Sequence, residues 1–216
     1  MRLRKLLLNG NSACTAQSTI ETVISMVQYA FDFTSFPILQ TERLILREMS
    51  PQDVTALLRH FGNPEVVRFL DMQPIRTNEQ AREWLQWMGS FYAQKAGLRW
   101  GIALKADHTL MGTAGLHGWD RESHFAEIGY DLTAPYWGEG YATEVARALV
   151  EFGWNEMNLN RIEADVVQGN MASMRVLEKL GFRQEGVMRQ RLLKGGKYYD
   201  LHFFSLLRSE YIPASE

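Results

Sequence analysis

The chain has 216 residues, 46% of them hydrophobic and 22% charged, which is sufficient length and an ordinary composition for one sizeable globular domain. Its formal net charge of −2 argues against a surface built for direct nucleic-acid binding. A single cysteine, Cys14, excludes an internal disulfide framework and a cysteine-rich zinc site, and the five histidines follow no metal-ligand spacing, so no metal is expected.

The first residues do not predict a secretory signal. "MRLRKLLLNGNSAC" starts with basic residues, but its apolar run is three leucines, which is shorter than a signal peptide needs. No apolar run elsewhere in the chain approaches the roughly 18 residues of a membrane span. We therefore expect a cytoplasmic protein that does not associate with a membrane.

Residues 1–36 differ in character from the rest and are expected to form an N-terminal extension. With Ser18 or Thr19 as an N-cap, this segment predicts a helix over 18–31. Its apolar residues recur every three or four positions, the period of one helix face: Ile20, Val23, Ile24, Val27 and Phe31. Such a face needs a partner surface, so we expect it to dock on its own domain or on a second subunit, in a monomer or a homodimer.

From residue 37 onward, strand and helix patterns follow one another at short intervals. Two helix starts carry N-cap signals, Ser50 before Pro51 and Thr77 three residues before Gln80. The predicted order is strand 42–49, helix from 50, helix 77–95, strands 99–105, 109–119 and 125–132, helix 140–157, strand 161–167, helix 171–182 and two strands around the turn at 194–197. This order predicts one α/β (α+β) domain over 37–216, a mixed sheet with flanking helices.

The stretch "WGEGYA", residues 137–142, lies between a predicted strand and a predicted helix. A helix N-terminus offers unpaired N–H groups and the positive end of a dipole, and glycines let the backbone approach an anion. No G-K-[ST] follows, and the three-glycine dinucleotide fingerprint is absent. Taken alone, the turn is equally compatible with a phosphate site and with simple close packing.

A second stretch, "QGNMASMRVLEKLGFRQEG", follows about 30 residues downstream. Its Asn170 is placed to cap a short helix, and Gly181 to end it. Together, "WGEGYA" and "N-x-x-S-x-x-V-L-E-K-L-G-F" resemble the two cofactor motifs of the GNAT superfamily of acyl-CoA-dependent N-acyltransferases. "TERLILREMSPQDV" and "PYWGEGYATE" resemble the branch of the ribosomal-protein N-terminal alanine acetyltransferases. The resemblance covers residues 37–210.

The resemblance implies a mostly antiparallel sheet that splays at the cofactor site. It also implies an acetyl group moved from acetyl-CoA to an amine by direct attack in a ternary complex. Two positions depart from the superfamily pattern. Trp137 stands where most members have Gln or Arg, and Leu177 stands where many have a tyrosine that protonates the departing thiolate.

The residues that the resemblance assigns to acetyl-CoA fall in three places. Strand 125–132 would pair with the pantetheine through its last residues, the glycine turn would hold the pyrophosphate, and the start of helix 171–182 would complete the site. The set is Asp131, Leu132, Thr133, Trp137, Gly138, Glu139, Gly140, Tyr141, Ala142, Asn170 and Ser173.

Two residues are the candidates for proton transfer. Glu127 resembles the position of a general base, which would take a proton from the amine directly or through a water. Ser173 would either give the thiol its proton or bind the pantetheine. His117, His124 and Asp200 are further base candidates.

The acceptor is left open between a protein N-terminal amine and a small-molecule amine. The alternative of another class is a non-catalytic acyl-CoA-binding module of the same fold, because intact cofactor motifs support binding without proving turnover. A nucleotide-phosphate enzyme is disfavoured because the lysine and the metal carboxylates of such sites are missing.

Overall fold

The computed structural model describes residues 31–213, so the predicted helix over 18–31 lies, except for Phe31, outside the described residues. Within the described range, the strands form a single sheet of eight in the order β1-β2-β3-β4-β5-β6-β8-β7. Every neighbouring pair is antiparallel except β5 and β6, which run parallel. The mixed, mostly antiparallel sheet predicted from the sequence is confirmed.

The strand bounds follow the predicted pattern closely. They are β1 Leu39–Gln40, β2 Leu44–Arg47, β3 Gly97–Leu104, β4 Leu110–Asp120, β5 Phe125–Leu132, β6 Arg161–Val167, β7 Arg183–Lys194 and β8 Lys197–Leu207.

The helices begin where the sequence places good N-cap residues. Ser50 and Thr77 each form a capping box, with Asp53 and Gln80 respectively. The helices are α2 Val54–Phe61, α3 Pro64–Val67, α4 Asn78–Ala93, α5 Tyr141–Asn155 and α6 Met171–Lys179, with short 3-10 turns at Pro51–Asp53, Ala134–Tyr136 and Arg208–Glu210. The four-residue helix α3 and the strand β1 were not predicted.

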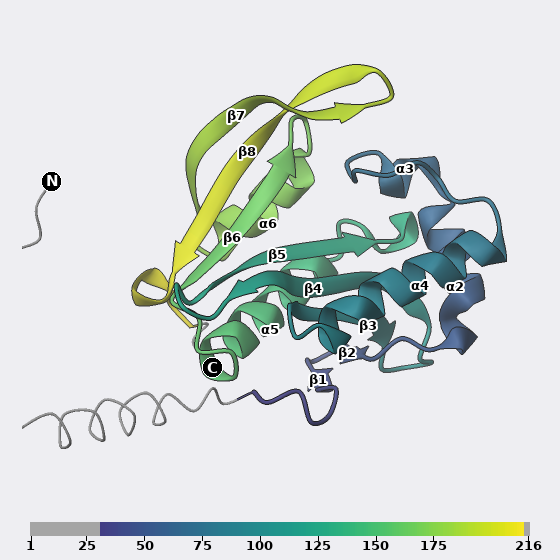
Figure 1. Cartoon of the computed structure of the whole chain (residues 1–216), viewed down its shortest axis with the longest axis horizontal. Helices are drawn as coiled ribbons and strands as arrows, with labels where there is room; N and C mark the ends of the chain where they lie inside the picture. Colours follow the sequence, from purple (N-terminus) through teal and green to yellow (C-terminus); the bar gives the residue numbers. More distant parts are fainter. Residues whose placement is uncertain (1–30, 214–216) are drawn as a thin grey trace, which may run out of the picture.

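Two hydrophobic clusters bury the two faces of the sheet. Helices α2 and α4 contact each other and cover β3 and β4, whereas α5 packs against β4 and β5 and contacts α6 (Figure 1). The larger cluster, on the α5 side, contains the fully buried Trp100 and Leu149. The smaller cluster, on the α4 side, contains Leu57 and Met88.

The sheet divides between β5 and β6. These two strands pair only over Phe125–Glu127 and Arg161–Glu163. Beyond that point β5 continues along β4 to Leu132, while β6 continues along β8 to Val167. Figure 1 shows the two arms of the sheet diverging from this point. The distal half of β5 therefore has one edge that no other strand occupies.

The aromatic residues just before β1 pack on the domain, although the sequence analysis assigned them to the extension. The ring of Phe31 lies 5.5 Å from that of Phe152 in α5, and the ring of Phe36 lies 5.7 Å from that of Trp100. Trp100 also donates its indole N–H to the carbonyl of Pro37 at 2.8 Å. Residues 31–36 thus complete the core on the α5 side.

We predict that a chain starting at residue 37 melts at least about 5 °C lower than a chain starting at residue 31, because it lacks three partly buried phenylalanine rings. Both truncations remove the same first thirty residues, so the difference between their melting temperatures reports the contribution of residues 31–36, which carry the three rings. Equal melting temperatures in differential scanning calorimetry would show that these rings do not stabilise the domain.

Candidate active site

Two cavities open where β5 and β6 part. One, of about 370 Å³, lies against the turn at residues 137–142, and we call it the glycine-turn cavity. The other, of about 520 Å³, lies between α4, β5, β6 and the β7–β8 hairpin, and we call it the aromatic cavity because Trp84 and Trp87 line it. The same residues line both cavities at their junction: Phe69, Leu70, Tyr130, Asn170 and Ser173. The two spaces are therefore neighbours across the gap in the sheet.

The glycine turn has the features of an anion site. Gly138 and Gly140 both have φ of +82°, in the left-handed region that favours glycine. Gly140 is the N-cap of the 15-residue helix α5, and no side chain among residues 31–213 caps that end. The first N–H groups of α5 and its dipole are thus left for an external acceptor. Both glycines line the cavity together with Tyr141 and Ala142.

Arg43, which directly precedes β2, braces this turn from behind. Its Nε donates to Glu144 Oε2 at 2.7 Å and its NH1 group donates to the carbonyl of Glu139 at 3.0 Å. Its guanidinium also lies 4.1 Å from the ring centroid of Tyr141. Sequence analysis did not find Arg43, and Glu139, which was expected to contact the cofactor, uses its carbonyl for this internal contact.

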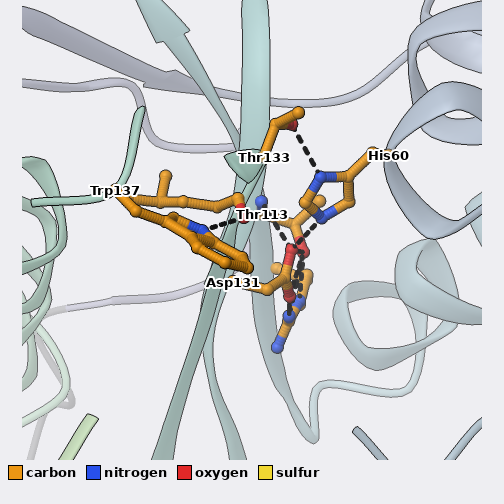
Figure 2. Close-up of polar contacts among 7 residues, drawn as sticks. His60, Thr113, Asp131, Thr133 and Trp137 are labelled. Atoms are coloured by element: carbon orange, nitrogen blue, oxygen red, sulfur yellow. Dashed lines mark hydrogen bonds and ion pairs between the residues drawn. The ribbon is translucent and has the colours of Figure 1, made fainter. Parts of the chain in front are cut away.

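Trp137 secures the end of β5. Its indole N–H donates to the carbonyl of Leu132 at 2.6 Å, and its ring, 47% exposed, lines the glycine-turn cavity (Figure 2). This contact gives Trp137 a physical role at a position that departs from the superfamily pattern of Gln or Arg.

Thr133, a predicted cofactor contact, forms two main-chain hydrogen bonds within the protein. Its N–H donates to the carbonyl of Met111 at 2.7 Å, and its carbonyl accepts from the N–H of Tyr136 at 2.9 Å. Both main-chain groups are thus used within the protein. Asp131 and Leu132 are the residues of the predicted strand end that line the cavity.

The side chain of Asp131 is the centre of a buried polar cluster (Figure 2). Its carboxylate pairs with Arg99 of β3, lies 2.5 Å from His60 Nε2 and accepts from the hydroxyl of Thr113 at 2.9 Å. The other ring nitrogen of His60 lies 2.8 Å from the Thr133 hydroxyl. Burial raises the pKa of Asp131, but Arg99, His60 and Thr113 together hold it below its ordinary value.

The start of α6 closes the junction between the cavities. The side-chain oxygen of Asn170 accepts from the N–H of Ser173 at 3.2 Å, which confirms Asn170 as the helix N-cap. The hydroxyl of Ser173 lies 3.1 Å from that of Tyr130. Asn170 and Ser173 are therefore brought together with the glycine turn, as the sequence analysis expected.

Glu127 lines the aromatic cavity, where it pairs in register with His117 of β4. Burial, with Asp165 and Glu163 adding repulsion, raises the pKa of Glu127 to about 7. Burial and the positive charge of Arg99 lower the pKa of His117 to about 4. At neutral pH the histidine is therefore uncharged and a weak base, while the carboxyl titrates in the range useful for a general base.

The other two base candidates lie away from both cavities. His124 Nδ1 lies 3.0 Å from the carbonyl of Asn158. The carboxylate of Asp200 accepts from the N–H of Gln190 at 2.8 Å, beside an irregularity in the β7–β8 pairing. Both contacts fix backbone, so the structure does not bring either residue to the site.

A lysine ties the β7–β8 hairpin to the far side of the aromatic cavity. The ammonium of Lys194 donates to the carbonyls of Val67, Arg68 and Leu70 at 2.5, 3.0 and 2.6 Å. Burial lowers its pKa, partly offset by the negative charge of Asp71. These carbonyls lie at the last residue of α3 and just beyond it, so the lysine caps that helix. It also holds in place the segment of Phe69 and Leu70, which line both cavities.

Over residues 31–213, no group of three or more His, Cys, Asp or Glu side chains is arranged to hold a metal ion. The same range contains no helix whose length and apolar character would allow it to span a membrane.

A sequence model of the acetyltransferase (GNAT) domain matches residues 43–183, more than half of the chain. The chain belongs to the GNAT acetyltransferases. It is 39% identical over 173 residues to the uncharacterized N-acetyltransferase YoaA of Bacillus subtilis, a match covering 80% of this chain and 98% of the relative. It is 25% identical over 189 residues to the ribosomal protein uS5 alanine N-acetyltransferase of Escherichia coli, covering 81% of this chain and 93% of the relative.

Solved GNAT structures share the fold. The crystal structure of a GNAT-family acetyltransferase from Bacillus anthracis matches with a TM-score of 0.71 and 27% identity, covering 81% of this chain and 100% of that one. The spermidine N-acetyltransferase from Vibrio cholerae, solved in complex with CoA and spermine, matches with a TM-score of 0.69 and 20% identity. The match covers 78% of this chain and 97% of that one. This GNAT protein is therefore an acetyl-CoA-dependent N-acetyltransferase.

The glycine-turn cavity contains hydrogen-bond donors of the kind that bind a diphosphate. Main-chain N–H groups at an uncapped helix N-terminus suit a diphosphate, and a Cβ at Gly140 would lie 3.5 Å from the guanidinium of Arg43. Two isosteric substitutions separate the effect of the added Cβ from the effect of charge.

We predict that Gly140→Asn weakens acetyl-CoA binding a few-fold and that Gly140→Asp weakens it about 10-fold or more beyond that. Asn and Asp both tolerate positive φ and both cap helices, so their difference reports the added charge, whose repulsion of the diphosphate the nearby Arg43 offsets only in part. Isothermal titration calorimetry at two salt concentrations should show a smaller difference in acetyl-CoA affinity between the two variants at high salt. Equal affinities of the two folded variants for acetyl-CoA would show that the diphosphate does not bind at this turn.

Proposed function

We propose that this GNAT enzyme acetylates a primary amine by direct attack on acetyl-CoA in a ternary complex. The donor would occupy the glycine-turn cavity and the amine the aromatic cavity. The observation that carries this proposal is the shared lining of the two cavities at Tyr130, Asn170 and Ser173. A donor in the glycine-turn cavity and an amine in the aromatic cavity would come into contact there, with no protein segment between them.

On the donor side, each part of acetyl-CoA has a matching surface. The N–H groups at Gly138, Gly140 and the start of α5 suit the diphosphate. The free edge of β5 at Asp131 and Leu132 suits the amide groups of the pantetheine, which can pair like a strand. Ser173 would then lie beside the thioester.

On the amine side, Glu127 is the proposed general base. An amine attacks through its lone pair, so an ammonium must first lose a proton. A carboxyl with a pKa of about 7 is half ionised at neutral pH, so it can accept that proton directly or through one water. The neighbouring carboxylate of Asp165 lines the same cavity and adds negative potential that attracts a cation.

The walls of the aromatic cavity favour an amine that carries an apolar group. Trp84 stacks on Phe61 and meets Trp87 edge to face at 4.8 Å, and Trp87 is 51% exposed. Met72 and Leu192 line the same cavity. We therefore propose an acceptor with one amine near Glu127 and an apolar or aromatic substituent against Trp87, either a small molecule or the first residue of a peptide.

We predict that Glu127→Gln lowers kcat by about 10²- to 10⁴-fold and leaves the affinity for acetyl-CoA unchanged. In the wild type, kcat/KM should rise with pH through a limb near pH 7, because only the carboxylate form accepts a proton. That limb should vanish in Glu127→Gln.

The matched control is Asp165→Asn, which removes a charge that raises the pKa of Glu127 and should move the limb to lower pH. A limb that stays in place in both variants would exclude Glu127 as the base.

We predict that phenethylamine and peptides beginning with Phe are acetylated with kcat/KM about 10-fold or more above spermidine, because burial of one large apolar group stabilises binding by about 1.5–3 kcal/mol. Trp87→Ala should remove most of this preference. Tyr198→Ala, which truncates an exposed aromatic residue on β8 outside both cavities, should not. A preference for spermidine, or one unchanged by Trp87→Ala, would contradict the proposed acceptor class.

A further inference from the structure

Tyr130 is the residue at the junction whose chemistry the proposed function leaves unused. It lies in the distal half of β5, where that strand has no partner on the β6 side. Its hydroxyl lies 3.1 Å from the hydroxyl of Ser173 and 3.3 Å from the Ser173 carbonyl. Burial raises the pKa of Tyr130 to about 12 despite the hydrogen bond to Ser173, so the phenol stays neutral and is a hydrogen-bond donor.

The tyrosine that many GNAT members use toward the departing thiolate is absent from this chain. Leu177 stands at that position and is fully buried. Among the described tyrosines, Tyr136 and Tyr141 line the glycine-turn cavity, and Tyr130 lines both cavities. A phenol is therefore present at the junction, but it comes from the strand β5 rather than from the helix α6.

The acidities of the two hydroxyl groups limit what the pair can do. A serine alkoxide and a tyrosinate are both more basic than a thiolate, whose ordinary pKa is near 8.5, so net proton transfer to sulfur from either group is uphill. A hydrogen bond donated to the departing sulfur requires no such transfer. Such a bond stabilises charge as it develops on sulfur.

We propose that Tyr130 is a positioning residue that makes Ser173 a hydrogen-bond donor to the sulfur of CoA. This inference rests on the proposed function. The Tyr130 hydroxyl donates to Ser173 Oγ. Because Ser173 Oγ then accepts a hydrogen bond from Tyr130, its own O–H group points toward the junction between the two cavities. The cavities on both sides of Ser173 leave that direction open to the thioester.

The reaction balances with this arrangement. The nitrogen lone pair of the amine forms the new C–N bond, the C–S bond breaks, and its electron pair stays on sulfur. Glu127, after it has released the ammonium proton to water, takes the second proton that the nitrogen loses once the C–N bond forms. The thiolate leaves with a hydrogen bond from Ser173 and takes a proton from water on release. The protonated Glu127 neutralises the hydroxide so formed, and Glu127 and both hydroxyl groups return to their starting states.

The experiment compares two donors that differ in one atom, acetyl-CoA and acetyl-seleno-CoA. A selenolate is a much weaker base than a thiolate and gains less from a hydrogen bond. Tyr130→Phe should lower kcat about 10- to 100-fold with acetyl-CoA, with KM for the donor within about 3-fold. With acetyl-seleno-CoA the loss should shrink to about 3-fold or less. Ser173→Ala should behave in the same way.

Two further variants sharpen the test. The double variant Tyr130→Phe with Ser173→Ala should be no slower than Ser173→Ala alone, because the tyrosine acts through the serine. Tyr211→Phe is the matched control, since Tyr211 also donates to a partner, Glu151 at 3.1 Å, and has a pKa raised to about 12, but lies outside both cavities. It should retain wild-type kcat.

Equal losses with both donors, or no loss in Tyr130→Phe, would overturn the role of Tyr130. If the wild type releases no CoA with any amine, the proposed function fails instead. The two failures are therefore distinguishable.

Discussion

The buried carboxylate of Asp131 is the interaction on which the site depends. It joins α2, β3 and β4 to the distal half of β5 through His60, Arg99 and Thr113. A buried charge of this kind is tolerated only while its partners are present, and removing one partner costs about 3–5 kcal/mol. The cluster therefore holds the end of β5 on the β4 side of the sheet. The other edge of β5 stays open because β6 pairs with it over only three residues.

The remaining features of the site follow from that open edge. The α5 N-terminus and the glycine turn lie at its far end, where Trp137 donates to Leu132 and Arg43 braces the loop. The diverging arm of β6 and β8 carries the hairpin whose Lys194 reaches the end of α3. In the proposed function, acetyl-CoA lies on one side of this gap in the sheet and the amine on the other. Glu127, in the aromatic cavity, has a pKa near neutrality because it is partly desolvated and lies near the negative charges of Asp165 and Glu163.

Sequence reasoning succeeded where the signal was local. The strands β3 to β6, the capping boxes at Ser50 and Thr77, and the Gly140 and Asn170 helix starts are set by neighbours within a few residues. Even the missed helix α3 carried a local signal, since Asn63 caps it and Pro64 opens it.

Sequence reasoning failed where a residue's role depends on a distant partner. Arg43 lies 101 residues from Glu144, His60 lies 71 residues from Asp131, and Lys194 lies 124 residues from Leu70. No spacing rule connects such pairs, because only the folded sheet brings them together. The main-chain hydrogen bonds of Thr133 with Met111 and Tyr136 could not be predicted for the same reason, since only the fold brings Met111 to Thr133.

In the proposed function, acetyl-CoA and the amine meet where β5 and β6 part. Calorimetry can test this with a bisubstrate compound in which the sulfur of CoA is joined through a –CH₂–CO– group to the nitrogen of phenethylamine. We expect this compound to bind at least about 100-fold more tightly than CoA, because the linked amine enters the aromatic cavity at a high effective concentration. An affinity equal to that of CoA would show that the two cavities do not form one continuous site.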